Sequence, residues 1–182
     1  MNILKRFEIN FIIVPSNNIT VMDFACVIAR LYVSSDNSEK INILRENYHL
    51  LPNIDSDQLC KILLLFTWKE YDSLDKYRKE TVCIFQKKLT DNANISKIVR
   101  FFEDDECIKE VVEILIEQIN EVNQPVAILS DISSDSIRND VLNILIKHIT
   151  YIHGYEAETL MRLYNEDSYR SKALDIIHRK II

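Results

Sequence analysis

Glycine and proline are scarce in this chain. Of its 182 residues only Gly154 is a glycine, and three are prolines. Dinucleotide-binding fingerprints, phosphate-binding loops and nucleophile elbows each need more than one glycine at fixed spacing, because their backbone must approach phosphate closely or adopt positive φ. Sandwiches and barrels of many short strands also need Gly and Pro in their turns. We therefore predict an all-α protein that lacks these motifs.

Closely spaced cysteines and long apolar runs are also missing. The four cysteines lie at least 23 residues apart, whereas zinc and redox motifs use C-x-x-C pairs. No apolar run approaches the ~20 residues that cross a bilayer, and "FIIV" near the start is shorter than the core of a signal peptide. We expect reduced thiols, a cytoplasmic location and no membrane partner.

Positive charge is in deficit. The net charge is −6, and no cluster of Lys and Arg exceeds a dipeptide, so we expect no nucleic-acid partner. A chain of this length, 47% hydrophobic, buries roughly 70% of the surface of its unfolded form. Residues 1–182 are therefore expected to form a single all-helical domain.

What the sequence does contain is a repeat. Apolar anchors recur at intervals of 30 to 36 residues, at Tyr32, Phe66, Phe102, Ile132 and Tyr164. The residues four before each anchor are also apolar, at Ile28, Ile62, Ile98, Ile128 and Leu160, and so are those three before, at Ala29, Leu63, Val99, Leu129 and Met161. Twelve residues after the anchors stand Leu44, Arg78, Ile114, Ile144 and Ile176, so only the second unit departs from the pattern.

Each unit reads as two helices joined by a short polar loop. The approximate units are 20–52, 55–88, 91–121, 124–153 and 155–182, with 1–19 as an N-terminal extension or partial unit. The pattern predicts an array of about five helical hairpins that resembles an α-solenoid. The alternative is a compact helical bundle whose amphipathic helices merely look alike.

Helix-end signals fit these units. Expected N-terminal signals are Thr20 with Asp23, Asp55 with Gln58, and Pro125 at a first helical position. Asp105, Asp135 and Asp167 are expected to begin second helices, where acids favour the positive end. Gly154 is expected to end the helix "SIRNDVLNILIKHITYIH" in the left-handed conformation, with His153 at that C-terminus.

The stretches "DSDQLCKILLLFTW" (55–68) and "DNANISKIVRFF" (91–102), with Leu74 between them, carry a family resemblance. Over residues 39–115 the sequence resembles the family catalogued as domain of unknown function 4476, with a partial second copy at 135–181. Asp55 stands where that family has Ser or Thr, and Trp68 replaces an aromatic of its Phe-x-Phe pair. The resemblance implies helical repeats and assigns no activity or catalytic residue.

We predict no catalytic residue, cofactor or metal site. The histidines are His49, His148, His153 and His178, and the closest pair is five residues apart, about 140° around a helix. Cys26 and Cys60, six residues before their anchors, are expected as small packed residues. "EDDE" (103–106) lacks the spacing of a calcium loop and suits the start of a helix.

The stretch "FTWKEYDSLDKY" places Trp68 and Tyr71 in an inter-helix loop, where the other units have polar residues. Loop aromatics are favoured binding anchors, so these two are the predicted partner-binding residues. Both ends, "MNILKRFEINFIIV" and "DIIHRKII", are apolar, which predicts docking onto something, another copy included, or a longer array.

We therefore expect a non-enzymatic protein–protein interaction or scaffold module. Two alternatives remain open. One is a helical bundle resembling viral Bcl-2-like proteins, which binds partner helices in a groove. The other is a hydrolase that uses carboxylates or a metal, among the 28 acidic residues.

Overall fold

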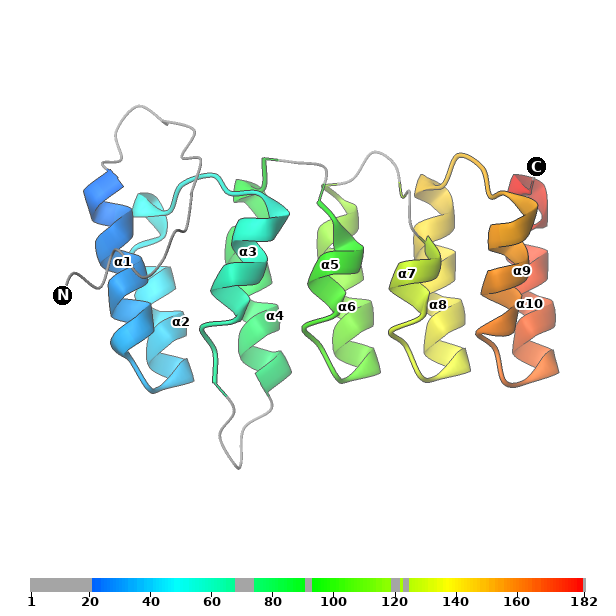
Figure 1. Cartoon of the computed structure of the whole chain (residues 1–182), viewed down its shortest axis with the longest axis horizontal. Coiled ribbons are helices and arrows are strands. Elements are labelled where there is room, and N and C mark those ends of the chain that lie inside the picture. Colours follow the sequence, from blue (N-terminus) through cyan, green and yellow to red (C-terminus); the bar gives the residue numbers. More distant parts are fainter. Residues whose placement is uncertain (1–20, 68–73, 91–92, 119–121, 123–124, 182) are drawn as a thin grey trace.

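The chain forms a row of helical hairpins (Figure 1). The computed structural model describes residues 21–67, 74–90, 93–118, 122 and 125–181. Within these residues the first helices of the hairpins are α1 (Val21–Val33), α3 (Ser56–Leu63), α5 (Ile95–Val99), α7 (Pro125–Leu129) and α9 (Gly154–Arg162). The second helices are α2 (Asn37–Glu46), α4 (Leu74–Phe85), α6 (Asp105–Ile116), α8 (Asp135–Leu145) and α10 (Asp167–Ile177).

The two sets of helices form two layers (Figure 1). Each helix packs against its hairpin partner, and along the row the second helices pack in the order α2, α4, α6, α8 and α10, as do the first helices α3, α5, α7 and α9. None of the described helices is enclosed by the others, as the central helix of a bundle would be. The prediction of an all-α array of helical hairpins is confirmed. None of the described helices is long and apolar enough to cross a membrane.

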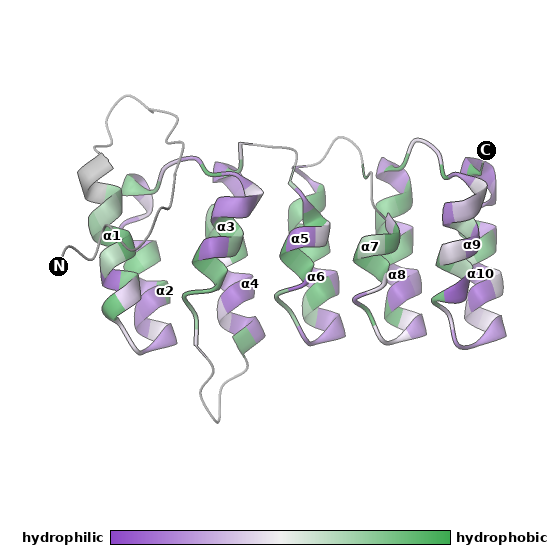
Figure 2. Ribbon diagram, in the orientation of Figure 1, coloured by the Kyte–Doolittle hydropathy of each residue, from purple (hydrophilic) through white to green (hydrophobic). Residues whose placement is uncertain are grey.

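Hydrophobic residues gather where the helices face one another, and hydrophilic residues lie on the outer turns (Figure 2). The buried residues form one continuous core that runs from Phe24 in α1 to Ile177 in α10. Short 3-10 turns follow four second helices, at Tyr48–Leu50, Gln86–Lys88, Ile146–His148 and His178–Lys180. Isolated parallel bridges, Ile54 to Leu89 and Ile152 to Ile181, then close two hairpins at the end opposite their loops.

The predicted helix starts agree with the structure. Asp55 and Gln58 form a capping box at α3, in which each side chain accepts the other residue's backbone N–H. Pro125 begins α7, and Asp105, Asp135 and Asp167 begin α6, α8 and α10. Thr20 lies outside the described residues.

The prediction for Gly154 and His153 is wrong. Helix α8 ends at Leu145 and is followed by the turn at Ile146–His148. Gly154 is the first residue of α9, and no described glycine has positive φ. His153 precedes that helix and donates its backbone N–H to Glu156 Oε2 at 3.1 Å. A strand-like segment separates the two helices, and the continuous apolar pattern of 136–153 concealed it.

The anchor pattern holds in four hairpins and fails in the first. Phe66, Phe102, Ile132 and Tyr164 are at most 5% exposed, whereas Tyr32 is 55% exposed. The four buried anchors lie beyond the ends of their first helices, but α1 continues to Val33 and includes Tyr32. Leu31, fully buried, replaces it in the core.

Candidate functional site

The loops that join the two helices of each hairpin lie along one edge of the array. Each described junction between hairpins uses one polar side chain in the first turn of the second helix to bind the loop of the following hairpin. These clamp residues are Asn37, Asp75, Asp105 and Asp135, and they hold the loops of the second, third, fourth and fifth hairpins. The clamp fixes the spacing of the loops.

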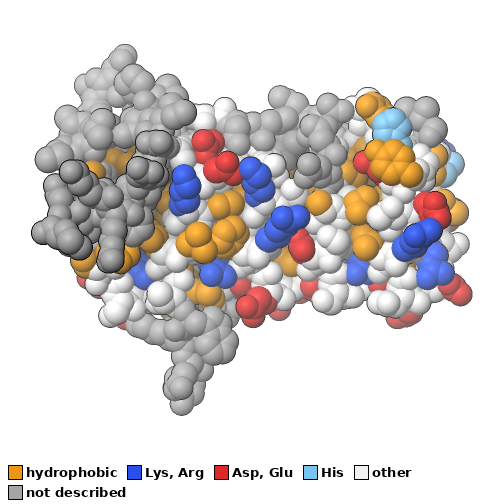
Figure 3. Space-filling view, viewed as in Figure 1, with side chains coloured by type: hydrophobic (Ala, Val, Ile, Leu, Met, Phe, Trp, Pro, Cys, Tyr) orange, Lys and Arg blue, Asp and Glu red, His pale blue; other side chains and the backbone are white. Residues whose placement is uncertain are grey.

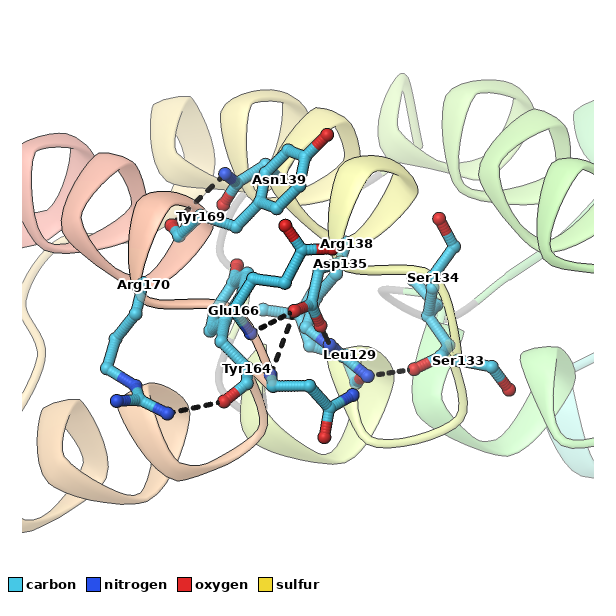
Figure 4. A network of polar contacts seen from close by, with 12 residues as sticks. Leu129, Ser133, Ser134, Asp135, Arg138, Asn139, Tyr164, Glu166, Tyr169 and Arg170 are labelled. Atoms are coloured by element: carbon cyan, nitrogen blue, oxygen red, sulfur yellow. Dashed lines mark hydrogen bonds and ion pairs between the residues drawn. The ribbon is translucent and has the colours of Figure 1, made fainter.

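At each of the three aspartates the carboxylate accepts two successive backbone N–H groups. Asp75 Oδ2 accepts the backbone N–H groups of Glu103 and Asp104 at 2.9 and 2.8 Å. Asp135 Oδ2 accepts those of Asn165 and Glu166, both at 2.8 Å (Figure 4). A carboxylate that accepts two backbone N–H groups makes charge-assisted bonds, which are roughly twice as strong as neutral ones. The N–H groups satisfied in this way are those that immediately precede the next second helix.

An arginine three residues later completes the clamp in the fourth hairpin. Arg138 is 4% exposed and forms an ion pair with Asp135. Its Nε donates to the carbonyl oxygen of Leu129 at 3.2 Å, and its guanidinium lies 5.2 Å from the ring centre of Tyr164. A buried ion pair is stable only when its remaining hydrogen-bonding groups are also satisfied. Here backbone groups of two adjacent hairpins satisfy them, which indicates a structural role.

The clamp was not predicted from the sequence, although a signal for it exists. The motif Asp-x-x-Arg occurs at Asp75, Asp135 and Asp167. The pattern by itself resembles an ordinary i,i+3 ion pair on an exposed helix face. Only the stacking of the hairpins shows that its first member also reaches a loop about 30 residues away.

The longest loop joins α3 to α4. Ten residues separate the end of α3 from the start of α4, whereas three to five residues separate the two helices of each other hairpin. The predicted anchors Trp68 and Tyr71 fall in this interval and lie outside the described residues. The base of the loop is firmly held. Asn37 Nδ2 donates to Thr67 O at 2.7 Å, and Thr67 N donates back to Asn37 Oδ1 at 3.2 Å.

The face made by the first helices mixes basic, acidic and apolar side chains (Figure 3). Leu64, the residue that directly follows α3, is 64% exposed. Lys97 on α5 forms an ion pair with Asp57 on α3 at 2.7 Å, so part of the basic charge is already balanced. This face has no single sign of charge that would select a partner.

On the opposite side an open groove of about 490 Å³ runs between α4 and α6. Its lining residues are Lys79, Cys83, Gln86, Glu110, Glu113, Ile114 and Glu117. Lys79 is paired with Glu110, and this hydrogen bond raises the pKa of the lysine. Gln86 Nε2 donates to Ile114 O at 2.7 Å and to Glu117 at 3.3 Å. These contacts join the two walls of the groove, so the polar side chains that line it are already partly paired with one another.

The cysteines are thiols, and none of the four forms a disulfide. Cys60 is half-buried, and burial together with Asp57 raises the pKa of its thiol to about 11. Burial likewise raises the pKa of Cys107 to about 11. Catalytic cysteines need a lowered pKa. Cys26 is exposed, so its predicted place in the packing is wrong, because α1 presents this side to solvent.

The acidic run at 103–106 is explained by helix and loop contacts. Asp104 caps α6 by accepting the N–H of Cys107 at 2.8 Å. Asp105 Oδ2 accepts the N–H groups of Ser133 and Ser134 at 3.1 and 2.7 Å. The prediction that this run begins a helix is confirmed. In the part of the chain that is described, no three His, Cys, Asp or Glu residues are grouped as metal ligands.

The fold and these surfaces define the class of protein, a helical repeat array built of clamped hairpins. Comparison with models of known families, with curated proteins and with solved structures gives no match to this chain. The resemblance over residues 39–115 stays a prediction.

Proposed function

We propose that this chain is a non-enzymatic, cytoplasmic interaction or scaffold module that binds another protein, with Trp68 and Tyr71 as anchors. The observation that carries the proposal is the separation of α3 from α4, which is longer than the separation of the helices in the other hairpins and begins with residues that α2 holds. A rigid scaffold that presents a longer loop is the usual arrangement of a binding loop.

The residues that directly precede Trp68 are held in place, which supports a role of Trp68 as an anchor. Phe66 is 3% exposed, and the Lys40 ammonium lies 5.7 Å from the centre of its ring. Lys40 also donates to the carbonyl oxygen of Leu65. Residues 65–67 are therefore held by a side chain of the core and by two side chains of α2. Aromatic residues that follow such a base lose less conformational entropy when they bind than residues of a free loop.

The two alternatives receive less support. A Bcl-2-like groove needs a bundle around a central helix, and the described helices form an open row. A carboxylate hydrolase needs two acids aimed at one substrate. The buried carboxylate of Asp135 instead faces the Arg138 guanidinium and the loop N–H groups of Asn165 and Glu166.

The test is an affinity capture from source lysate with the full chain, compared with the double variant Trp68→Ala/Tyr71→Ala. The matched control is Tyr151→Ala/Tyr155→Ala, which removes two aromatics that are 48% and 68% exposed near the fifth hairpin. Circular dichroism must show equal helicity for all three proteins. We expect a partner that the wild type and the control retain and the loop variant loses.

Equal retention by the loop variant and the control would refute Trp68 and Tyr71 as the anchors. A partner lost only with the control would move the binding surface to the fifth hairpin. Turnover of a substrate by the purified chain, lost on replacement of an acidic residue, would refute the non-enzymatic assignment.

A further inference from the structure

The junction between the fourth and fifth hairpins is held differently from the three junctions before it. Ion pairs join the hairpins at each earlier junction: Arg45 with Glu80, Lys79 with Glu110, Lys97 with Asp57, Lys109 with Asp140, and Arg100 with Asp131. Residues 125–181 are described without a gap, and within them no ion pair joins the fourth hairpin to the fifth. The ion pairs of this segment each lie within one helix.

The residue three positions after the clamp also acts differently at this junction. At the first two junctions it donates to a backbone carbonyl of the next hairpin, in the pairs Lys40 with Leu65 and Arg78 with Phe101. Ile108 stands at this place in the third hairpin, whose junction with the fourth has two ion pairs. Arg138 instead donates to the Leu129 and Ile132 carbonyls of its own hairpin. The guanidinium therefore adds no hydrogen bond across the junction.

Two buried polar atoms at this junction have no hydrogen-bond partner among the described residues. Tyr164 is 1% exposed, and its hydroxyl has no partner. Asn139 is 7% exposed, and its Nδ2 donates to Tyr169 O at 3.2 Å (Figure 4), but its Oδ1 has no partner. The other such atoms belong to side chains that bond or pair across an earlier junction: Arg78, Glu80 and Asp131. A buried polar atom without a partner destabilises the packed state, because water would satisfy it once the packing opens.

The hydroxyl of Tyr164 is peculiar to the fifth hairpin. The same anchor position holds Phe66, Phe102 and Ile132 in the three hairpins before it, and all are buried. Burial raises the pKa of the Tyr164 phenol, so the group stays protonated and remains a hydrogen-bond donor. The packed junction leaves that donor unsatisfied.

The only glycine of the chain lies in the segment that crosses this junction. Gly154 is the first residue of α9, and no described glycine has positive φ, so the packed conformation does not require glycine. Glycine has more backbone freedom than any other residue, and hinges are residues at element ends that absorb φ/ψ changes. Gly154 stands at such a place, directly after the segment that leaves the fourth hairpin.

The fifth hairpin is also closed on itself. Helix α9 packs against α10, and Ile152 N donates to Lys180 O at 2.7 Å in the bridge between Ile152 and Ile181. Across the junction, the Asp135 clamp and the packing of α8 on α10 and of α7 on α9 are the main contacts. The hairpin is therefore joined more firmly within itself than to its neighbour by polar contacts.

We propose that the row opens at the junction between the fourth and fifth hairpins, where α9 and α10 separate as a unit from α7 and α8 about Gly154. In the opened state water satisfies the Tyr164 hydroxyl and Asn139 Oδ1, and the side of α7 and α8 that the fifth hairpin covers becomes accessible. The three earlier junctions stay closed. The inference does not involve Trp68 or Tyr71, so it does not depend on the proposed function.

Native-state hydrogen exchange of the full chain in low urea separates such an opening from unfolding of the whole array. Amides of α9 and α10 should exchange about tenfold or more faster than those of α6. Their exchange should also depend less on urea, because the opening exposes less surface than global unfolding. Exchange of α9 and α10 only together with α6, at one rate and with one urea dependence, would overturn the proposal.

Two Tyr→Phe variants test the cause. Tyr164→Phe removes a hydroxyl without a partner and should slow exchange in α9 and α10 about fivefold. The matched control is Tyr77→Phe, at a tyrosine that is 7% exposed and shares a hydrogen bond of 3.1 Å with Ser38 Oγ in the first hairpin. This control should speed exchange in α4 and leave α9 and α10 unchanged, because they exchange while the first two hairpins stay packed.

Equal or faster exchange of α9 and α10 in Tyr164→Phe would overturn the proposal, since it would show that the hydroxyl is satisfied in the closed state. Acceleration of α9 and α10 by Tyr77→Phe to the same extent as α4 would also overturn it. That result would show that the array unfolds as one cooperative unit.

Discussion

Replacement of Asp135 by alanine tests whether its carboxylate stabilises the packing of adjacent hairpins or only forms an ion pair within its own helix. The change removes the acceptor of the Asn165 and Glu166 N–H groups and leaves the buried guanidinium of Arg138 without a carboxylate. Asp167 provides a control of the same residue type, at the same place in its helix and with the same i,i+3 arginine.

Asp135→Ala should lower the free energy of unfolding severalfold more than Asp167→Ala. Asp135 and Arg138 side chains are both 5% exposed, and removal of one partner from a buried pair costs about 3–5 kcal/mol. The Asp167 side chain is 92% exposed, and an exposed pair contributes less than about 1 kcal/mol. Asp135→Asn should fall between them at about 1–3 kcal/mol, because the amide keeps one acceptor oxygen but loses the charge.

Urea unfolding followed by circular dichroism measures the free energy of unfolding of each variant. Amide hydrogen exchange adds a local measurement. In Asp135→Ala the Asn165 and Glu166 amides should lose protection, while those of Glu103 and Asp104, held by Asp75, should keep it. Equal destabilisation by Asp135→Ala and Asp167→Ala would refute the view that the carboxylate acts between hairpins.

Two further outcomes are expected. At pH 8, Cys60 should react with iodoacetamide about 100-fold more slowly than a thiol of ordinary pKa 9.0, because its pKa is raised to about 11 and only the thiolate reacts. Asp57→Asn should lower that pKa and speed the reaction; peptide mass spectrometry against pH would show a midpoint near 9 if the argument is wrong. Gly154→Ala should stabilise the chain by about 0.4–1 kcal/mol, because this helix-starting residue does not use positive φ. A fall in the unfolding midpoint would contradict the assigned backbone conformation.

The architecture was largely predictable because it depends on local signals. Apolar spacing and residues such as Asp55, Pro125 and Asp105 mark helices and their ends within a few positions. It was harder to predict from the sequence which residues of different hairpins are equivalent. Because ten residues separate α3 from α4, the residue equivalent to Ile114 is Ile84 rather than Arg78. Counting from the anchor assumes loops of equal length.

The surfaces were less predictable than the fold. The clamps join residues 28 to 31 positions apart, so no local window contains both partners. Leu174 and Leu142 look equivalent in the sequence, and only the end of the row distinguishes the exposed residue from the buried one. An amphipathic pattern shows which side of a helix is apolar but not what covers it.

Because every clamp points from one hairpin to the next, the array has a direction. A chain shortened from the C-terminal end keeps every remaining loop attached and exposes one more clamp, whereas a chain shortened from the N-terminal end leaves its new first loop without an acceptor. The two ends of the described row are therefore not interchangeable.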